Sequence, residues 1–332
     1  MENYPGDIKA KSLPKKAFYF KENLAIIVVF CLCFAMAVSF ASCTGGPGDQ
    51  LTSSEPEETS TPGETSTPQD EKPDEYFSKF DLNTSYGTDA TVITLTKSSV
   101  EIKGSGAASD GGKINITEPG DYVVSGVMSD GQIIVSVKKT EKVHLIFTGV
   151  DITCKTSSPV WVKSADKVSI TLAAGTKNYL SDSTRYVFDN PDNEPNACLF
   201  SKDDLTINGT GALIVTGRYN NGICSKDDLR IISGEITVNA KNNGLKGNDS
   251  VSIRGGKLTI KSSDDGIKTT NDSTPGKGFI YIRDGEISII SGDDALQAEQ
   301  AIIVKGGEVT IKAGGKTINC PGTVDIAQGT VK

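Results

Sequence analysis

The sequence is poor in the residues that soft-metal sites and helical cores use. Its 332 residues include one histidine, one tryptophan and seven cysteines, and the cysteines lack the paired spacing of zinc ligands. No basic patch is visible, which argues against a nucleic-acid partner. No long amphipathic helical pattern appears, whereas 35 glycines indicate many turns. These features are typical of one large β-rich domain.

The N-terminal region is predicted to export and tether the protein. Leu24 to Ser42 form an uncharged apolar run that follows several lysines, as in an export signal. The next residue completes FASC, which resembles a bacterial lipobox, so residues 1–43 are expected to be a signal peptide with Cys43 lipidated. The alternative is an uncleaved signal anchor, since this run is just long enough to cross a hydrocarbon core. Both place the remaining chain at the extracellular face of the cell membrane, attached only through its N-terminus.

Residues 44–78 are predicted to be a disordered spacer. They are rich in Ser, Thr, Pro and Glu and contain too few apolar residues for a core. They carry a net charge of −8, whereas residues 79–332, the predicted folded domain, carry only −2. Net charge would therefore not attract an anionic polymer to this domain, and such attraction would have to be local.

A repeat of about 22 residues organises the domain. Short bursts of alternating apolar residues, such as LRI then ITV and VSI then LTI, are separated by turns that contain glycine. The motif SSDDGIKTT, at residues 262–270, occupies a slot that returns as NNGIC, NNGLK and DDALQ. The successive slots start at Asn220, Asn242, Asp264 and Asp293, so two intervals are 22 residues and the last is 29. The extra seven residues fit an insertion around NDSTPGK.

Three short strands and three turns in each repeat predict one coil of a parallel β-solenoid. Stacked coils would bury two inward columns of aliphatic side chains. One column contains Leu229, Val251, Ile280 and Ile302, and the other contains Ile231, Ile253, Ile282 and Val304. A β-propeller blade would need roughly 40 residues, and a sandwich would not hold this register. The last stretch, TINCPGTVDIAQGTVK, is expected to leave an exposed strand edge unless a partner or cap covers it.

The repeated acid pairs predict a cation site. Equivalent residues of neighbouring coils lie about 4.8 Å apart, so Asp264 should stack near Asp293 and Asp265 near Asp294. These carboxylates repel one another unless a cation offsets them. Calcium fits best, because it takes six to eight oxygen ligands, which could include the amide oxygen of Asn243. Alternatively, each pair forms only an Asx turn, and the Asn-Asn copies form a structural amide ladder.

The run LFSKDDLTINGTGALIVTGRYNNGICSKDDL, together with the DDGIK slot, carries a resemblance that covers most of residues 88–312. It resembles the bacterial carbohydrate-binding domain family typified by a clostridial cell-surface β-helix protein that binds cellulose and polygalacturonic acid. The resemblance implies a right-handed parallel β-helix, bound calcium and kinship to pectate lyases, but it does not imply lyase activity. This chain departs from the family's Asp-Asp-Gly at Asn242-Asn243-Gly and Asp293-Asp294-Ala.

Four residues are predicted to contact carbohydrate. Lys246 and Lys268 have outward parity and follow the NNGL and DDGI slots, where they could pair with uronate groups. Trp161 and Tyr281 also have outward parity, and an exposed aromatic ring can stack on a sugar. Alternatively, the two lysines only lie on a solvated strand face and bind no ligand.

The leading functional hypothesis is a calcium-containing module that binds plant cell-wall polysaccharide, preferably acidic pectin but also cellulose, without cleaving it. A calcium-dependent lyase is one alternative, in which one of these lysines would act as the base. A surface adhesin with a protein or host-glycan partner is the other.

Overall fold

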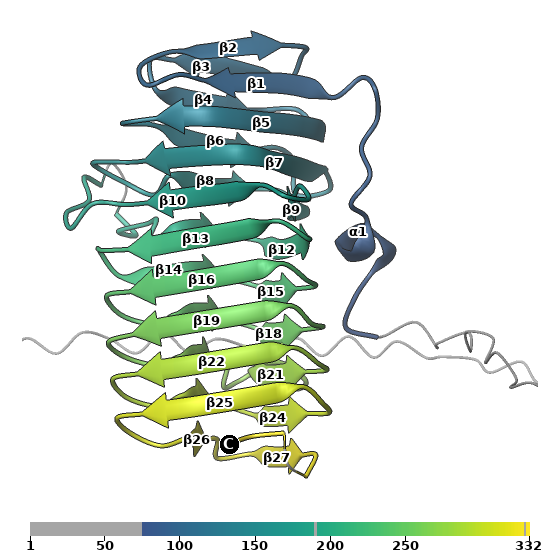
Figure 1. Cartoon of the computed structure of the whole chain (residues 1–332), viewed down its shortest axis with the longest axis vertical. Helices are drawn as coiled ribbons and strands as arrows, with labels where there is room; N and C mark the ends of the chain where they lie inside the picture. The colour runs from purple at the N-terminus through teal and green to yellow at the C-terminus, as the bar shows by residue number, and fades with distance from the viewer. Residues whose placement is uncertain (1–74, 189–190, 329) are drawn as a thin grey trace, which may run out of the picture. The chain divides into compact units, whose positions relative to one another are not determined.

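The computed structural model describes residues 75–188, 191–328 and 330–332, and these residues form mainly β-strands (Figure 1). Within these ranges there is one short helix, α1 (Lys79–Leu82). The strands form sheets of ten and seventeen strands, in which parallel pairing dominates. The prediction of an all-β fold is confirmed.

Three ladders of strands run along the long axis of the folded part, and apart from β3 each strand bonds in parallel to its equivalents one repeat away. The ten-stranded sheet, here the first ladder, comprises β3 (Ala107–Asp110), β4 (Lys113–Ile116), β6 (Gln132–Ser136), β8 (Val160–Ser164), β11 (Ala197–Ser201), β14 (Asn221–Ser225), β17 (Leu245–Gly247), β20 (Ile267–Thr269), β23 (Leu296–Gln297) and β26 (Ile318–Asn319). The second ladder comprises β9 (Lys167–Leu172), β12 (Asp204–Gly209), β15 (Asp228–Ile231), β18 (Ser250–Ile253), β21 (Phe279–Ile282), β24 (Ala301–Val304) and β27 (Thr323–Ile326). The third ladder comprises β10 (Lys177–Ser181), β13 (Ala212–Gly217), β16 (Glu235–Ala240), β19 (Lys257–Ser262), β22 (Glu286–Ser291) and β25 (Glu308–Ala313). Four N-terminal strands, β1 (Thr91–Leu95), β2 (Val100–Lys103), β5 (Gly120–Met128) and β7 (Lys142–Thr153), complete the larger sheet.

The register follows the predicted repeat. Leu229 pairs with Val251, Val251 with Ile280 and Ile280 with Ile302, and all four side chains are buried. The longer interval arises because residues 270–278 connect β20 to β21, where the preceding coil needs only residues 248–249. Burial of each aliphatic side chain in such a column contributes roughly 1.5–3 kcal/mol. Both predicted inward columns are present.

A segment before the first strand, residues 75–83, packs along the outer face of the second ladder, and we call it the strap. The Tyr76 ring stacks on Tyr281 with centroids 4.2 Å apart, and Phe77 is buried against the same tyrosine. The prediction that Tyr281 exposes its ring is therefore wrong, since the ring is only 8% exposed. The folded part also begins before Ser78, where the predicted spacer was expected to end.

A buried ion pair fastens the strap to the sheet. Asp81 is fully buried, and its carboxylate accepts from Nζ of Lys167 at 2.9 and 3.1 Å and from Oγ1 of Thr206 at 2.5 Å. Ser78 caps the helix and also donates to this carboxylate. Burial by itself would raise the pKa of Asp81, but these hydrogen bonds and the Lys167 charge lower it overall.

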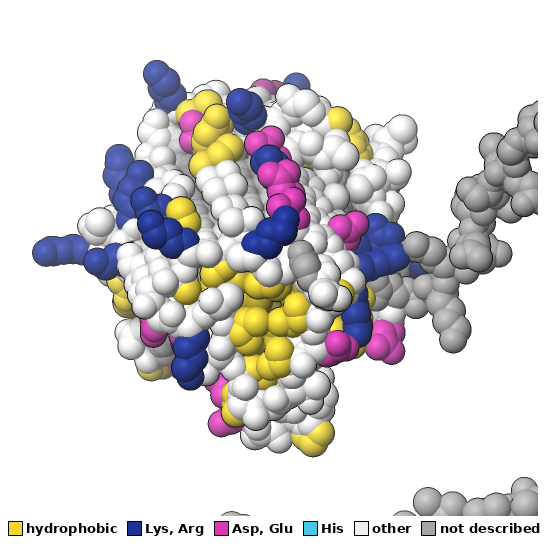
Figure 2. Space-filling model, turned by 60° about the horizontal axis from the view of Figure 1, so that its bottom comes forward, with side chains coloured by type: hydrophobic (Ala, Val, Ile, Leu, Met, Phe, Trp, Pro, Cys, Tyr) yellow, Lys and Arg dark blue, Asp and Glu magenta, His cyan; other side chains and the backbone are white. Residues whose placement is uncertain are grey.

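The two ends of the stack differ. At the N-terminal end β2 turns back antiparallel to β1, and β3 does the same to β4. At the C-terminal end, Ile311, Ile318 and Ile326 are only partly buried against the core. Figure 2 brings this end forward and shows hydrophobic side chains gathered there. The edge of β25 is covered by residues 330–332, which pair with it, so the exposed edge that the sequence predicts is limited to the last strands of the other two ladders.

The predictions for residues 1–43, including Cys43, and for most of residues 44–78 lie outside the described residues. None of the helices in the described ranges is long and apolar enough to span a membrane.

Candidate functional site

The repeated Asn and Asp pairs lie in the turns that lead from the third ladder to the first, where they stack into what we call the Asx column. Its members are Asn220, Asn221, Asn242, Asn243, Asp264, Asp265, Asp293 and Asp294. Backbone hydrogen bonds join successive turns, with the N–H of Asp264 donating to Asn242 and that of Asp293 to Asp264, each at 3.3 Å. The predicted stacking of these pairs is confirmed.

The second residue of each pair supports the next turn. Oδ1 of Asn221 accepts from Nδ2 of Asn243 at 2.9 Å, which is the predicted amide ladder. Oδ1 of Asp265 accepts the backbone N–H of Asp294 at 3.1 Å, and Oδ1 of Asp294 accepts that of Lys316 at 2.7 Å. These oxygens therefore have the structural role that the Asx-turn interpretation gave them.

Three acids of the column converge. Asp264, Asp265 and Asp293 have carboxylate oxygens within 4.8 Å of one another, and they are the only such group of three potential ligands in the described residues. Asp265 is buried, Asp264 is half-buried and Asp293 is exposed. Partial burial and the neighbouring charge of Asp265 raise the pKa of Asp264, and Asp293 and Asp294 add to this effect.

The amide of Asn243 faces this group, at 3.2 Å from Oδ2 of Asp264 and 3.3 Å from Oδ2 of Asp265. With its nitrogen turned toward the acids, the orientation that its neighbours favour, the amide donates to both carboxylates in place of the bond to Asn221. If the amide oxygen is turned toward them, oxygens of all three residues converge as they do around a hard cation. Asn243 therefore lies beside the acid group, whereas the predicted ligand Asp294 lies outside it, because its Oδ2 accepts from Nδ2 of Asn319 at 2.6 Å.

The predicted lysines lie beside this group on the first ladder. Lys246 pairs in register with Lys268, and both side chains are partly exposed. Nζ of Lys268 donates to Oδ2 of Asp265 at 2.6 Å, so this ammonium offsets part of the acidic charge. The Lys246 side chain makes no hydrogen bond or ion pair within the described residues, and its charge is available to a ligand.

Comparisons with known proteins identify the family of this chain. The family model of carbohydrate-binding domain-containing proteins matches residues 110–331. The chain belongs to this carbohydrate-binding family. A relative from Acetivibrio thermocellus, described as a carbohydrate-binding domain-containing protein, is 48% identical over 129 residues, which are 39% of this chain and 45% of that protein. The aligned region thus spans less than half the length of that relative. The predicted family is confirmed.

A solved structure is also similar to this carbohydrate-binding domain. The polysaccharide lyase-like protein from C. thermocellum, determined as a gadolinium derivative, superposes with a TM-score of 0.72 and 42% sequence identity. The match covers 73% of this chain and 98% of that one.

Trp161 does not present its ring as the sequence predicted. It is 7% exposed and belongs to an apolar cluster with Phe200 and Cys224 on the outer face of the first ladder. Nζ of Lys163 lies 4.0 Å from the ring centroid and covers it. Parity placed this ring on the outer face correctly, but it did not indicate what lies over that face.

The carbohydrate-binding domain has other aromatic rings that the sequence analysis missed. Tyr186, Phe188 and Tyr219 group next to the Asx column, and each is partly exposed. One feature of the sequence could have indicated this group: Tyr219 stands directly before the Asn220 slot, and the other three copies have no aromatic residue at that position.

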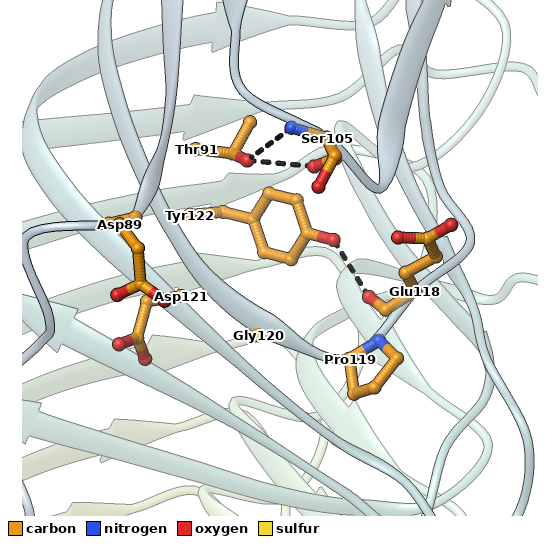
Figure 3. Close-up of a pocket in the computed structure, with 9 residues that line it drawn as sticks. Asp89, Thr91, Ser105, Glu118, Pro119, Gly120, Asp121 and Tyr122 are labelled. Atoms are coloured by element: carbon orange, nitrogen blue, oxygen red, sulfur yellow. Dashed lines mark hydrogen bonds between the residues drawn. The ribbon is translucent and has the colours of Figure 1, made fainter.

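A cavity at the N-terminal end gathers acids without forming a comparable group. Figure 3 shows Asp89 and Asp121 on one side of Tyr122 and Glu118 on the other. The Tyr122 hydroxyl donates to the Glu118 carbonyl at 2.7 Å, and Asp121 accepts from the backbone of Gly87 at 3.0 Å. The other carboxylate oxygen of Asp121 lies 3.1 Å from Nδ1 of His144. These contacts are structural.

Proposed function

We propose that this domain is a right-handed parallel β-helix of about 22 residues per coil that binds calcium and an acidic plant cell-wall polysaccharide. Polygalacturonate is the preferred ligand and cellulose a further one, and neither is cleaved. The observation that carries the proposal is the convergence of Asp264, Asp265 and Asp293 beside Lys246 and Lys268. Membership of a carbohydrate-binding family supports a polysaccharide as the partner.

Calcium suits the residues that converge there. Asp264, Asp265, Asp293 and the Asn243 amide would hold it, because they supply only hard oxygen donors and no nitrogen or sulfur ligand. Bound calcium would offset their charge and would supply a positive centre for substrate carboxylates. The C. thermocellum protein forms a gadolinium derivative, and gadolinium is likewise a hard cation. This chain's own Lys268, already bonded to Asp265, would orient that carboxylate.

Retention on immobilised polygalacturonate tests the binding. The domain carries little net charge, so attraction of the anionic polymer must come from a cation bound by the three acids and from Lys246 and Lys268. We expect retention to fall on addition of chelator and in the double variant Lys246→Ala, Lys268→Ala. Retention on uncharged cellulose should survive the lysine changes. Unchanged retention on polygalacturonate under both treatments would contradict the proposal.

A lyase is the second candidate, since the similar solved structure is called lyase-like. A lysine that acts as base must present a neutral amine to the substrate, whereas Nζ of Lys268 donates to Asp265 at 2.6 Å. We therefore expect the ultraviolet absorbance of unsaturated uronides to stay flat during long incubation with calcium at alkaline pH. Steady growth that disappears in Lys268→Ala would make the protein an enzyme.

We further propose that the precursor is exported and tethered as a lipoprotein on the cell surface through Cys43. The apolar run and FASC support this. The domain would then act outside the cell, where the polymer is found.

A further inference from the structure

Three aromatic rings lie together at one end of the Asx column. Tyr186 and Tyr219 stack with their centroids 4.2 Å apart and their planes 18° from parallel. Phe188 lies 6.0 Å from the first ring and 5.9 Å from the second, tilted against both. The three rings, which we call the aromatic triad, come from the connection between β10 and β11 and from the turn between β13 and β14.

The internal packing of the fold accounts for only part of the triad. The Tyr186 hydroxyl donates to Oδ2 of Asp182 at 2.7 Å and lies 3.1 Å from the Ala197 carbonyl, so it fixes the connection to the sheet. The Tyr219 hydroxyl makes no hydrogen bond with another described residue. All three side chains remain partly exposed, although aromatic surface is favourably buried. Grouped exposed aromatic rings commonly mark a binding surface.

Tyr219 occupies a place that the repeat does not require. Gly217 pairs with Ala240 in the next coil. The carbonyl of Asn220 likewise accepts from the backbone N–H of Asn242 in that next coil. Gly217 and Ala240 are 23 residues apart in sequence, whereas Asn220 and Asn242 are 22 residues apart. The turn that contains Tyr219 is therefore one residue longer than the next turn. The extra residue brings an aromatic ring to the column without disturbing the register of the following strand.

The triad and the acid group lie on the same edge of the domain. Asn220, which follows Tyr219, is two coils from Asp264, or about 10 Å at the usual strand spacing. A polysaccharide that runs along the stack could contact both places at once. The rings have no formal charge, and a flat ring attracts the C–H face of a sugar whether or not that sugar carries a carboxylate.

We propose that the aromatic triad is a stacking subsite for an uncharged hexose ring of a glucan, and that it works without calcium. Tyr219, which is partly exposed, supplies the stacking ring, and Tyr186 and Phe188 hold it in place. The inference rests on the proposed function in that the ligand is a polysaccharide, but it does not depend on the cation or the lysines. It would explain how one edge takes both an acidic and a neutral polymer.

The test uses the folded protein in the presence of chelator, with cellohexaose as the probe in calorimetry and soluble hydroxyethyl cellulose in affinity gels. We expect wild type to bind both, and Tyr219→Leu, which keeps apolar bulk but removes the flat face, to bind about tenfold more weakly. Tyr219→Phe should bind like wild type. Tyr86→Ala is the matched control, because Tyr86 is 50% exposed and lies by the turn between the second and third ladders.

The subsite would be overturned by a lack of binding of either probe to wild type, or by equal binding of wild type and Tyr219→Leu with unchanged melting temperatures. Equal loss in Tyr86→Ala would also count against it. Retention of the same variants on polygalacturonate with calcium separates the two proposals. Loss of glucan binding with polygalacturonate retention intact in Tyr219→Leu supports the subsite. Cellohexaose binding by wild type without any polygalacturonate retention would reject the proposed function alone.

Discussion

At the scale of single residues, the two members of each Asp pair have different environments. Asp265 and Asp294 each use one oxygen to accept a backbone N–H of the following coil. Asp264 and Asp293 face outward and approach other carboxylates. Removing an outward acid therefore removes charge without breaking a turn, which makes these two residues the sharper probes of a cation site.

Calcium should stabilise the domain through these acids. At about 100 times its dissociation constant it would add roughly 2.7 kcal/mol to the free energy of unfolding, seen as a rise of several degrees in melting temperature that chelator reverses. The double variant Asp264→Asn, Asp293→Asn should lose most of this rise, and Asp272→Asn, an exposed acid in the inserted connection, should keep it. Identical melting curves with and without chelator would leave the turn as the only role of these pairs.

The response to calcium should also depend on pH. The pKa of Asp264 in the folded state is raised above its ordinary value of 3.8. At pH values above this raised pKa, the ionised carboxylate destabilises the folded state. Protonation removes this destabilisation as the pH falls through the raised pKa. Calcium competes with this proton. We expect the calcium-induced rise in melting temperature to shrink as the pH is lowered from 7 toward 4 and to do so less in Asp264→Asn. An equal rise at both pH values would contradict the coupling.

The sequence predicted the stacking of the acid pairs correctly and the exposure of Trp161 and Tyr281 wrongly, for one physical reason. The acid pairs stack because their register follows directly from the repeat, as the hydrogen bond between Asp264 and Asp293 shows. Exposure depends instead on what lies over the sheet. Trp161 is covered by Lys163 and Tyr281 by Tyr76. Neither contact recurs with the sequence repeat, so the repeat could not predict it.

At the scale of elements, the ladders could be predicted from the sequence repeat and the strap could not. Alternating apolar residues predicted the second and third ladders, because each inward side chain must meet its equivalent in the next coil. The strap has no such pattern. Tyr76 and Phe77 follow a long acidic segment, and their burial depends on a distant patch around Ile232 and Tyr281.

The strap should contribute substantially to stability through Asp81. Asp81→Asn removes the shorter of the two ion pairs of the buried Lys167 ammonium and leaves the longer one, to Asp204 at 3.4 Å. Breaking a buried pair completely costs about 3–5 kcal/mol, so the loss here should be smaller than that. We expect a fall of several degrees in melting temperature at pH 7, whereas Lys79→Ala, at an exposed helix position, should have little effect. The pKa of Asp81 is lowered, so its contribution is complete above about 3.8 and is lost as the pH falls through the folded-state pKa. A loss in Asp81→Asn that is as large at pH 3 as at pH 7 would argue against the charge as its cause.

At the scale of the whole molecule, the proposed tether determines where binding takes place. Cells grown with a palmitate analogue should label the wild-type protein, and Cys43→Ala should abolish the label because the lipidated thiol is missing. Cys320→Ala is a suitable control, since it removes a free thiol from the folded domain. Equal labelling of wild type and Cys43→Ala would favour the signal anchor.

The strap has a mechanical consequence for a protein held at its N-terminus. It contacts the stack from β21, at Tyr281, to β9, at Lys167, before the chain continues to β1. A pull that enters the folded part at residue 75 therefore loads the stacked tyrosines and the Asp81 ion pair first. Only after these give way does the force reach β1, from which the coils could be peeled one at a time. Under the proposed tether, a load between a bound polymer and the membrane would pass from the binding edge to the strap and would bypass the terminal strand β1 until the strap contacts break.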